Sequence, residues 1–112
     1  MNSPVNVLLV GDSATDGGLF LRTLRKGPFV PVVEAVTTQA AFRDALAKRT
    51  WDVVIADLDR PRFGGTQAFA IFQQTAPDIP FILIADRPDL ATLIDFAARG
   101  VRDVVERSDL NR

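Results

Sequence analysis

The chain has 112 residues, of which 47% are hydrophobic and 24% are charged, and its formal net charge is -1. These values are typical of a single domain that buries a core, and they give no reason to expect binding to nucleic acid or to an anionic membrane. The sequence contains neither cysteine nor histidine. This excludes disulfides, thiolate-bound or histidine-bound zinc, and every mechanism that needs a histidine general base.

The N-terminal sequence, MNSPVNVLLVGD, has neither the basic start nor the cleavage site of a signal peptide. The apolar stretches are all far shorter than the ~20 residues that a membrane-spanning helix requires. We therefore expect a cytoplasmic protein without a membrane partner.

Five short apolar segments have the length and the valine and isoleucine content of β-strands. In chain order they are residues 5–10, 31–36, 52–57, 80–85 and 101–106. The first, third and fourth are almost continuously apolar, which is typical of central strands in a parallel sheet covered on both faces.

Three of the intervening segments have the periodicity of amphipathic helices: residues 38–49, 66–76 and 88–99. Thr38 is the expected N-cap of the first, and Gly100 is the expected end of the third. In the third segment, i, i+3, i+4, i+7, i+8 spacing predicts a core-facing stripe of Leu90, Leu93, Ile94, Ala97 and Ala98. Strands alternating with helices at this spacing predict an α/β fold, a doubly wound five-stranded parallel sheet with right-handed crossovers.

The alternation stops at ERSDLNR, where Ser108 has the character of an N-cap for a further helix that has no room to form. A sheet of this kind needs helices on both faces. We therefore expect either that the natural chain continues, so that the final helix is missing here, or that another molecule covers this face, as in a homodimer.

Aspartates lie at or just after the carboxyl ends of several predicted strands. In a parallel sheet these ends meet at one edge, and ligands bind at that edge in folds of this kind. The aspartates are Asp12, Asp57 and Asp86, with Asp16 and Asp59 in the adjoining loops. Oxygen ligands without histidine or cysteine suit a hard cation such as Mg²⁺, and Arg107 adds a positive charge after the fifth strand. A carboxylate nucleophile, a cation and a fixed positive charge are what phosphoryl transfer to aspartate requires. Aspartate is also common in turns and helix caps, so the pattern alone leaves a functional site and a purely structural role as alternatives.

Segment by segment, the chain resembles the receiver domain of two-component response regulators. VNVLLVGDS resembles the family's first strand with its acidic pair, and WDVVIADLDRPRFGG resembles its phospho-acceptor strand and the turn that follows. TAPDIPFILIAD resembles the fourth strand, and ARGVRDVVERSD the fifth. The resemblance implies a flavodoxin-like sheet with strand order 2-1-3-4-5. It also implies that residues 1–112 form a receiver domain in the N-terminal part of a longer regulator.

The resemblance also implies roles for individual residues. Asp57 would be the phospho-acceptor, Asp12 a direct Mg²⁺ ligand, and the backbone carbonyl of Asp59 would complete the metal shell. Arg107 stands in place of the family's lysine, which keeps the charge but not the compact ammonium group. Such a domain is not an enzyme beyond gaining and losing the phosphoryl group on Asp57.

The chain departs from the family pattern at several further positions. Gly11 replaces the first acidic residue, so we expect weak Mg²⁺ binding unless the side chain of Asp59 compensates. Ala85 replaces a threonine or serine whose hydroxyl contacts the phosphoryl group, Val104 replaces a switching aromatic residue, and Ser108 replaces a proline. Without that hydroxyl and that ring, we expect phosphorylation to move the fourth strand and the loop after it very little.

These observations predict a signal-transduction receiver that takes a phosphoryl group on Asp57 from a sensor histidine kinase or phosphotransfer protein. It would relay the change to an output module in the same chain or in a partner. The alternative is a pseudo-receiver that acts as a phosphorylation-independent interaction or dimerisation domain. A third hypothesis, a small-molecule-binding module, is disfavoured because the first turn, GDSATDGG, lacks the G-x-G-x-x-G pattern.

Overall fold

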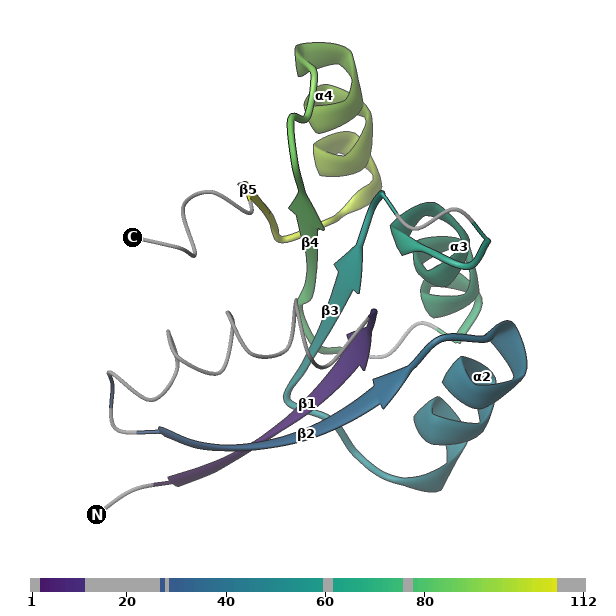
Figure 1. Cartoon of the computed structure of the whole chain (residues 1–112), viewed down its shortest axis with the longest axis vertical. Coiled ribbons are helices and arrows are strands. Elements are labelled where there is room, and N and C mark those ends of the chain that lie inside the picture. Colours follow the sequence, from purple (N-terminus) through teal and green to yellow (C-terminus); the bar gives the residue numbers. More distant parts are fainter. Residues whose placement is uncertain (1–2, 12–26, 28, 60–61, 76–77, 107–112) are drawn as a thin grey trace.

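The computed structural model describes residues 3–11, 27, 29–59, 62–75 and 78–106. Within these residues, five parallel strands form one sheet in the order β2-β1-β3-β4-β5 (Figure 1). The strands are β1 Ser3–Val10, β2 Phe29–Val36, β3 Val53–Asp57, β4 Phe81–Ala85 and β5 Asp103–Glu106. The helices are α2 Gln39–Lys48, α3 Gly65–Thr75 and α4 Leu90–Arg99. This confirms the predicted fold class and strand order.

The two faces of the sheet carry separate apolar clusters, because successive side chains of a strand point to opposite faces. Leu8 and Val10 of β1 belong to the larger cluster, which also holds side chains from α2, α3 and α4; α2 and α3 lie to the right of the strands in Figure 1. Val7 and Leu9 belong to the smaller cluster on the other face. That cluster is completed by Val53, Ile55 and Ile84, and partly buried Val5, Val33 and Ile82 pack beside it.

Phenylalanine rings form the centre of the larger cluster. Phe69 of α3 lies 5.1 Å from Phe81 and 5.9 Å from Phe96, measured between ring centroids. Phe72 lies 5.0 Å from Phe81, and all four rings are buried. The rings therefore join α3 and α4 to β4 through aromatic contacts.

Both predicted helix boundaries are confirmed. The Thr38 hydroxyl accepts a hydrogen bond from the Ala41 amide at 3.1 Å, and Gly100 ends α4 in the left-handed conformation with φ 102°. Asp89 caps the start of α4 by accepting a hydrogen bond from the Thr92 amide at 2.7 Å, which holds the pKa of that carboxyl below its usual value.

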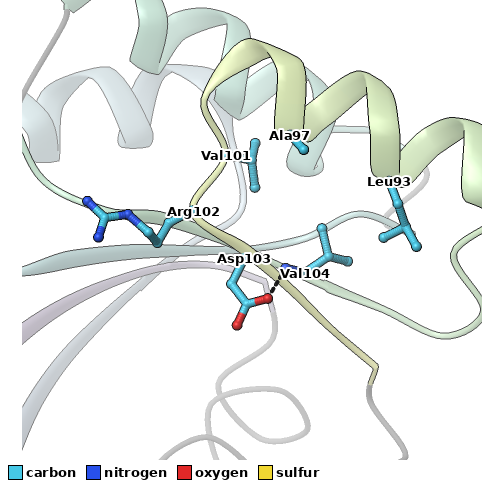
Figure 2. Close-up of a pocket in the computed structure, with 6 residues that line it drawn as sticks. All are labelled: Leu93, Ala97, Val101, Arg102, Asp103 and Val104. Atoms are coloured by element: carbon cyan, nitrogen blue, oxygen red, sulfur yellow. Dashed lines mark hydrogen bonds between the residues drawn. The ribbon is translucent and has the colours of Figure 1, made fainter.

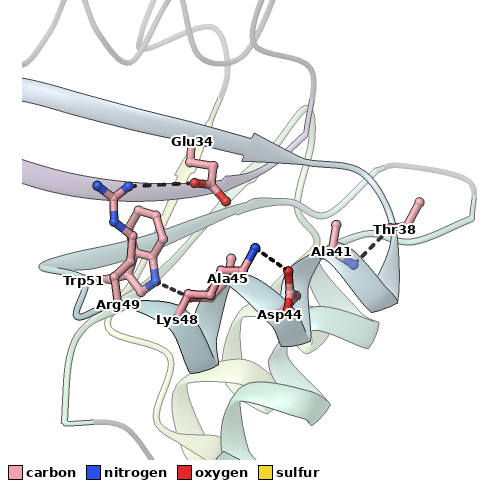
Figure 3. Close-up of polar contacts among 8 residues, drawn as sticks. All are labelled: Glu34, Thr38, Ala41, Asp44, Ala45, Lys48, Arg49 and Trp51. Carbon is pink, nitrogen blue, oxygen red and sulfur yellow. Dashed lines mark hydrogen bonds and ion pairs between the residues drawn. The ribbon is translucent and has the colours of Figure 1, made fainter.

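Polar contacts fix the end of α2 and the segment after it (Figure 3). The indole N–H of Trp51 donates to the Ala45 carbonyl at 2.9 Å, and the Arg49 guanidinium lies 5.0 Å from the centroid of the Trp51 ring. Arg49 also lies 3.7 Å from Glu34 of β2. These contacts attach the end of α2 to β2 and to the segment that leads into β3.

The predicted core-facing stripe of α4 is wrong. Leu90 and Ile94 are 71% and 60% exposed, and Phe96 is the buried residue of the helix. Leu93 and Ala97 line an open groove of about 350 Å³ between α4 and β5, together with Val104 (Figure 2). The periodicity located an apolar stripe correctly, but the large Phe96 ring, packed on Phe69, determines which side of the helix meets the core.

The helix start expected at Ser108 lies outside the described residues. Among the helices that are described, none is long and apolar enough to cross a membrane.

Candidate functional site

Asp57 is the last residue of β3, and all five residues of this strand are buried. The residue is only 8% exposed, and in the described part of the chain it is the one charged residue that is buried. A buried carboxylate needs hydrogen-bond partners to offset its lost hydration. The backbone amide of Asp59 provides one, donating to Asp57 Oδ1 at 2.9 Å.

The turn after β3 is tied to the end of β4 by two hydrogen bonds. The Leu58 amide donates to the Ile84 carbonyl at 2.8 Å. The Asp86 amide donates to Asp59 Oδ2, also at 2.8 Å. Asp57, Asp59 and Asp86 therefore lie together at the carboxyl edge of two adjacent strands, as the sequence predicted.

The start of α3 packs directly against this turn. Gly65 approaches the Leu58 backbone and the Leu83 side chain so closely that a Cβ at position 65 would overlap Leu83 and lie 3.1 Å from the Leu58 Cα. The Gly64 amide donates to the Gln67 side chain at 3.0 Å, which closes the first turn of the helix. The absence of a side chain at position 65 thus lets α3 fix the backbone next to Asp57.

Other predicted site residues divide into two groups. Asp12, Asp16 and Arg107 lie outside the described residues, so their approach to Asp57 stays a prediction. Ala85 ends β4 and is 1% exposed, while Val104 is partly buried in β5 beside the α4 groove (Figure 2).

One oxygen of the Asp59 carboxylate, Oδ2, is engaged by the Asp86 backbone amide. This bond links two loops, and the sequence pattern contains no signal for it. In the described part of the chain, no group of three or more acidic side chains is arranged to hold a metal ion. A single buried carboxylate is compatible with a hard divalent cation that binds through one or two carboxylates and keeps water or phosphate oxygens as further ligands.

Comparisons in sequence find partial relatives. No protein-family model matches the chain. The chain is 28% identical over 82 residues to a protein-glutamate methylesterase/protein-glutamine glutaminase of Rhodospirillum centenum, covering 73% of this chain and 21% of that protein. It is 31% identical over 80 residues to the Azospirillum brasilense protein of the same name, and this match covers 71% of this chain and 20% of that protein. The chain thus spans about a fifth of the length of these relatives.

Comparisons in structure find response regulators. The phosphorylated cyanobacterial phytochrome response regulator RcpA has a TM-score of 0.76 at 18% identity, with 95% of this chain and 85% of that chain covered. A LuxR-family response regulator from Aurantimonas has a TM-score of 0.75 at 23% identity, with 94% of this chain and 75% of that chain covered. A Burkholderia pseudomallei response regulator with a phosphorylated aspartic acid and a calcium ion gives 0.70 at 18% identity, with 91% and 59% covered. These likenesses establish the fold.

Proposed function

We propose that this chain, which has the fold of response-regulator receiver domains, accepts a phosphoryl group on Asp57 and communicates this modification to an output module. The observation that carries the proposal is the buried Asp57 carboxylate at the carboxyl end of β3, oriented by the Asp59 amide. A carboxylate held in this way is ready to act as a nucleophile without first ordering its surroundings.

In the proposed step an Asp57 oxygen attacks the phosphorus of a phosphorylated donor. The new phosphorus–oxygen bond makes an acyl phosphate. At the same time the bond from phosphorus to the donor's nitrogen or oxygen breaks, and the leaving group takes the electron pair. Burial of Asp57 limits the access of water that would otherwise compete for the phosphoryl group.

We expect Asp12, Asp57 and the backbone carbonyl of Asp59 to hold Mg²⁺, and Arg107 to place a positive charge beside the phosphoryl group. A bound cation neutralises the repulsion between a carboxylate and an incoming phosphoryl group. The calcium ion of the Burkholderia pseudomallei neighbour supports a divalent cation here. Binding should be weak, because Gly11 supplies no carboxylate and the Asp59 side chain contacts Asp86.

A sensor histidine kinase or a phosphotransfer protein is the proposed donor. The output module belongs to the same polypeptide or to a partner. The curated relatives, about five times as long as the matched part, are consistent with an output module in the same polypeptide.

Incubation with acetyl phosphate and Mg²⁺, followed by intact-mass analysis, tests the proposal. We expect the wild type to gain one phosphoryl group, and we expect no gain when a chelator is present or when Asp57→Asn is used. Asp52→Asn is the matched control. Asp52 is exposed and accepts a backbone amide hydrogen bond from Asn6 at 2.7 Å, so its loss should leave the mass gain intact. A gain that persists in Asp57→Asn, or that is equal in chelator, contradicts the proposal.

A further inference from the structure

The main chain and the side chain of Asp59 form hydrogen bonds with different parts of the site. Its backbone amide donates to Asp57 Oδ1 at 2.9 Å. Its carboxylate Oδ2 accepts from the Asp86 backbone amide at 2.8 Å. The main chain of Asp59 therefore contacts the proposed phospho-acceptor, and its side chain contacts the loop after β4.

These two hydrogen bonds should respond in opposite ways to a phosphoryl group on Asp57. Such a group carries about -1.5 to -2 charges at neutral pH and replaces the single negative charge of the Asp57 carboxylate, so the site becomes more negative by about half to one charge. The added negative charge favours an amide donor, so the Asp59 N–H remains well placed. The same charge repels the Asp59 carboxylate, which belongs to the same short turn, because like charges in close proximity raise the free energy of the ionised state.

We infer that Asp59 is a positioning residue that couples the state of Asp57 to the loop after β4. Its carboxylate holds the Asp86 amide while Asp57 is unmodified and releases that amide when Asp57 is phosphorylated. The inference rests on the proposed function, since it requires phosphorylation of Asp57.

The release has a defined structural consequence. Asp86 follows β4 directly, and Asp89, three residues further on, is the N-cap of α4. Freeing the Asp86 amide removes the hydrogen bond that joins this connecting segment to the turn after β3. A ligand or modification shifts a conformational equilibrium only through contacts that differ between the two states. The Asp59–Asp86 hydrogen bond is such a contact, and it needs neither a hydroxyl at Ala85 nor a ring at Val104. With this bond in place, the loop after β4 is expected to respond to phosphorylation, which replaces the expectation of little movement that the family pattern alone gave.

Amide NMR signals of ¹⁵N-labelled protein test the coupling, with intact mass measured on the same sample before and after acetyl phosphate and Mg²⁺. We expect the Asp86 signal to shift on phosphorylation. The Asn6 amide is an internal control, because it also donates to a carboxylate, Asp52 Oδ2, but at the amino end of β3. Its signal should stay in place.

Two substitutions separate the charge from the hydrogen bond. Asp59→Asn keeps an acceptor oxygen but removes the negative charge, so the bond to Asp86 should survive phosphorylation and the Asp86 shift should fall to the level of Asn6. Asp59→Ala removes the acceptor, so the Asp86 signal should already be displaced before phosphorylation and change little after it. Both variants retain the backbone carbonyl of residue 59. If Asp59 had a purely structural role, phosphorylation would shift the Asp86 signal equally in the wild type and in Asp59→Asn.

The outcomes distinguish this inference from the proposed function. A mass gain with an Asp86 signal that moves no more than that of Asn6 overturns the inference and leaves Asp57 as the acceptor. An Asp86 shift in Asp59→Asn as large as in the wild type also overturns it. The absence of any mass gain in the wild type overturns the proposed function and the inference together.

Discussion

Replacing Phe69 by alanine is expected to lower the free energy of unfolding by about 3–5 kcal/mol. Phe69 is 2% exposed and contacts the rings of Phe72, Phe81 and Phe96 at centroid distances of 6.3, 5.1 and 5.9 Å. The substitution removes all three ring contacts and leaves a cavity between α3, α4 and β4. Because a domain of this size is stable by only about 5–15 kcal/mol, the variant should lose a large fraction of its total stability.

Phe29→Ala is the matched control for this prediction. It removes the same side chain at a position on edge strand β2 that is 43% exposed. We expect a clearly smaller loss of unfolding free energy than in Phe69→Ala, because less apolar surface returns to water and no enclosed cavity forms. Urea unfolding followed by circular dichroism measures both variants, and equal losses would show that the Phe69 cluster is not the centre of the core.

Gly65→Ala should destabilise the protein by about 1–3 kcal/mol, the range found for overpacked cores. In an ordinary helical position the same change usually stabilises, because alanine lowers the entropy of the unfolded chain. Here the new methyl group would overlap the Leu83 side chain and lie 3.1 Å from the Leu58 Cα. Leu83 is fully buried, so it cannot move into open space.

The exposed neighbour Thr66 offers the control for Gly65→Ala. Thr66→Ala changes the same turn of α3 without entering the core, and we expect its unfolding free energy to stay near that of the wild type. Thermal or urea unfolding measures the stability of both variants against the wild type. A Gly65→Ala protein as stable as the wild type would mean that α3 can move away from β4 at little cost.

Local features of the fold were accessible from the sequence. Thr38 and Gly100 act within a few residues of their own positions, so their chemistry alone predicts where α2 begins and α4 ends. The parallel sheet follows from the alternation of strands and helices. Once strand ends share an edge, the joint placement of Asp57, Asp59 and Asp86 follows as well.

Features that depend on tertiary packing were not accessible. The spacing of Leu90 and Ile94 identifies an apolar stripe, but it does not say that one ring, Phe96, would face the core instead. In the same way, the direction of the Asp59 side chain depends on how the loop after β4 approaches the turn after β3. The pairing of Asp57 with Ile84 across two strands fixes that approach, and it is a long-range property of the sheet.

Chemical mapping of the phosphorylated residue tests the identity of the acceptor most directly. Borohydride reduces an acyl phosphate to an alcohol, which converts a phosphorylated aspartate into homoserine. After treatment with acetyl phosphate and Mg²⁺, reduction and proteolysis, tandem mass spectrometry locates the converted position. We expect homoserine at position 57 alone. Conversion at position 12, 59 or 86 in its place, or no conversion in a sample that has gained mass, would contradict the assignment of Asp57 as the phospho-acceptor.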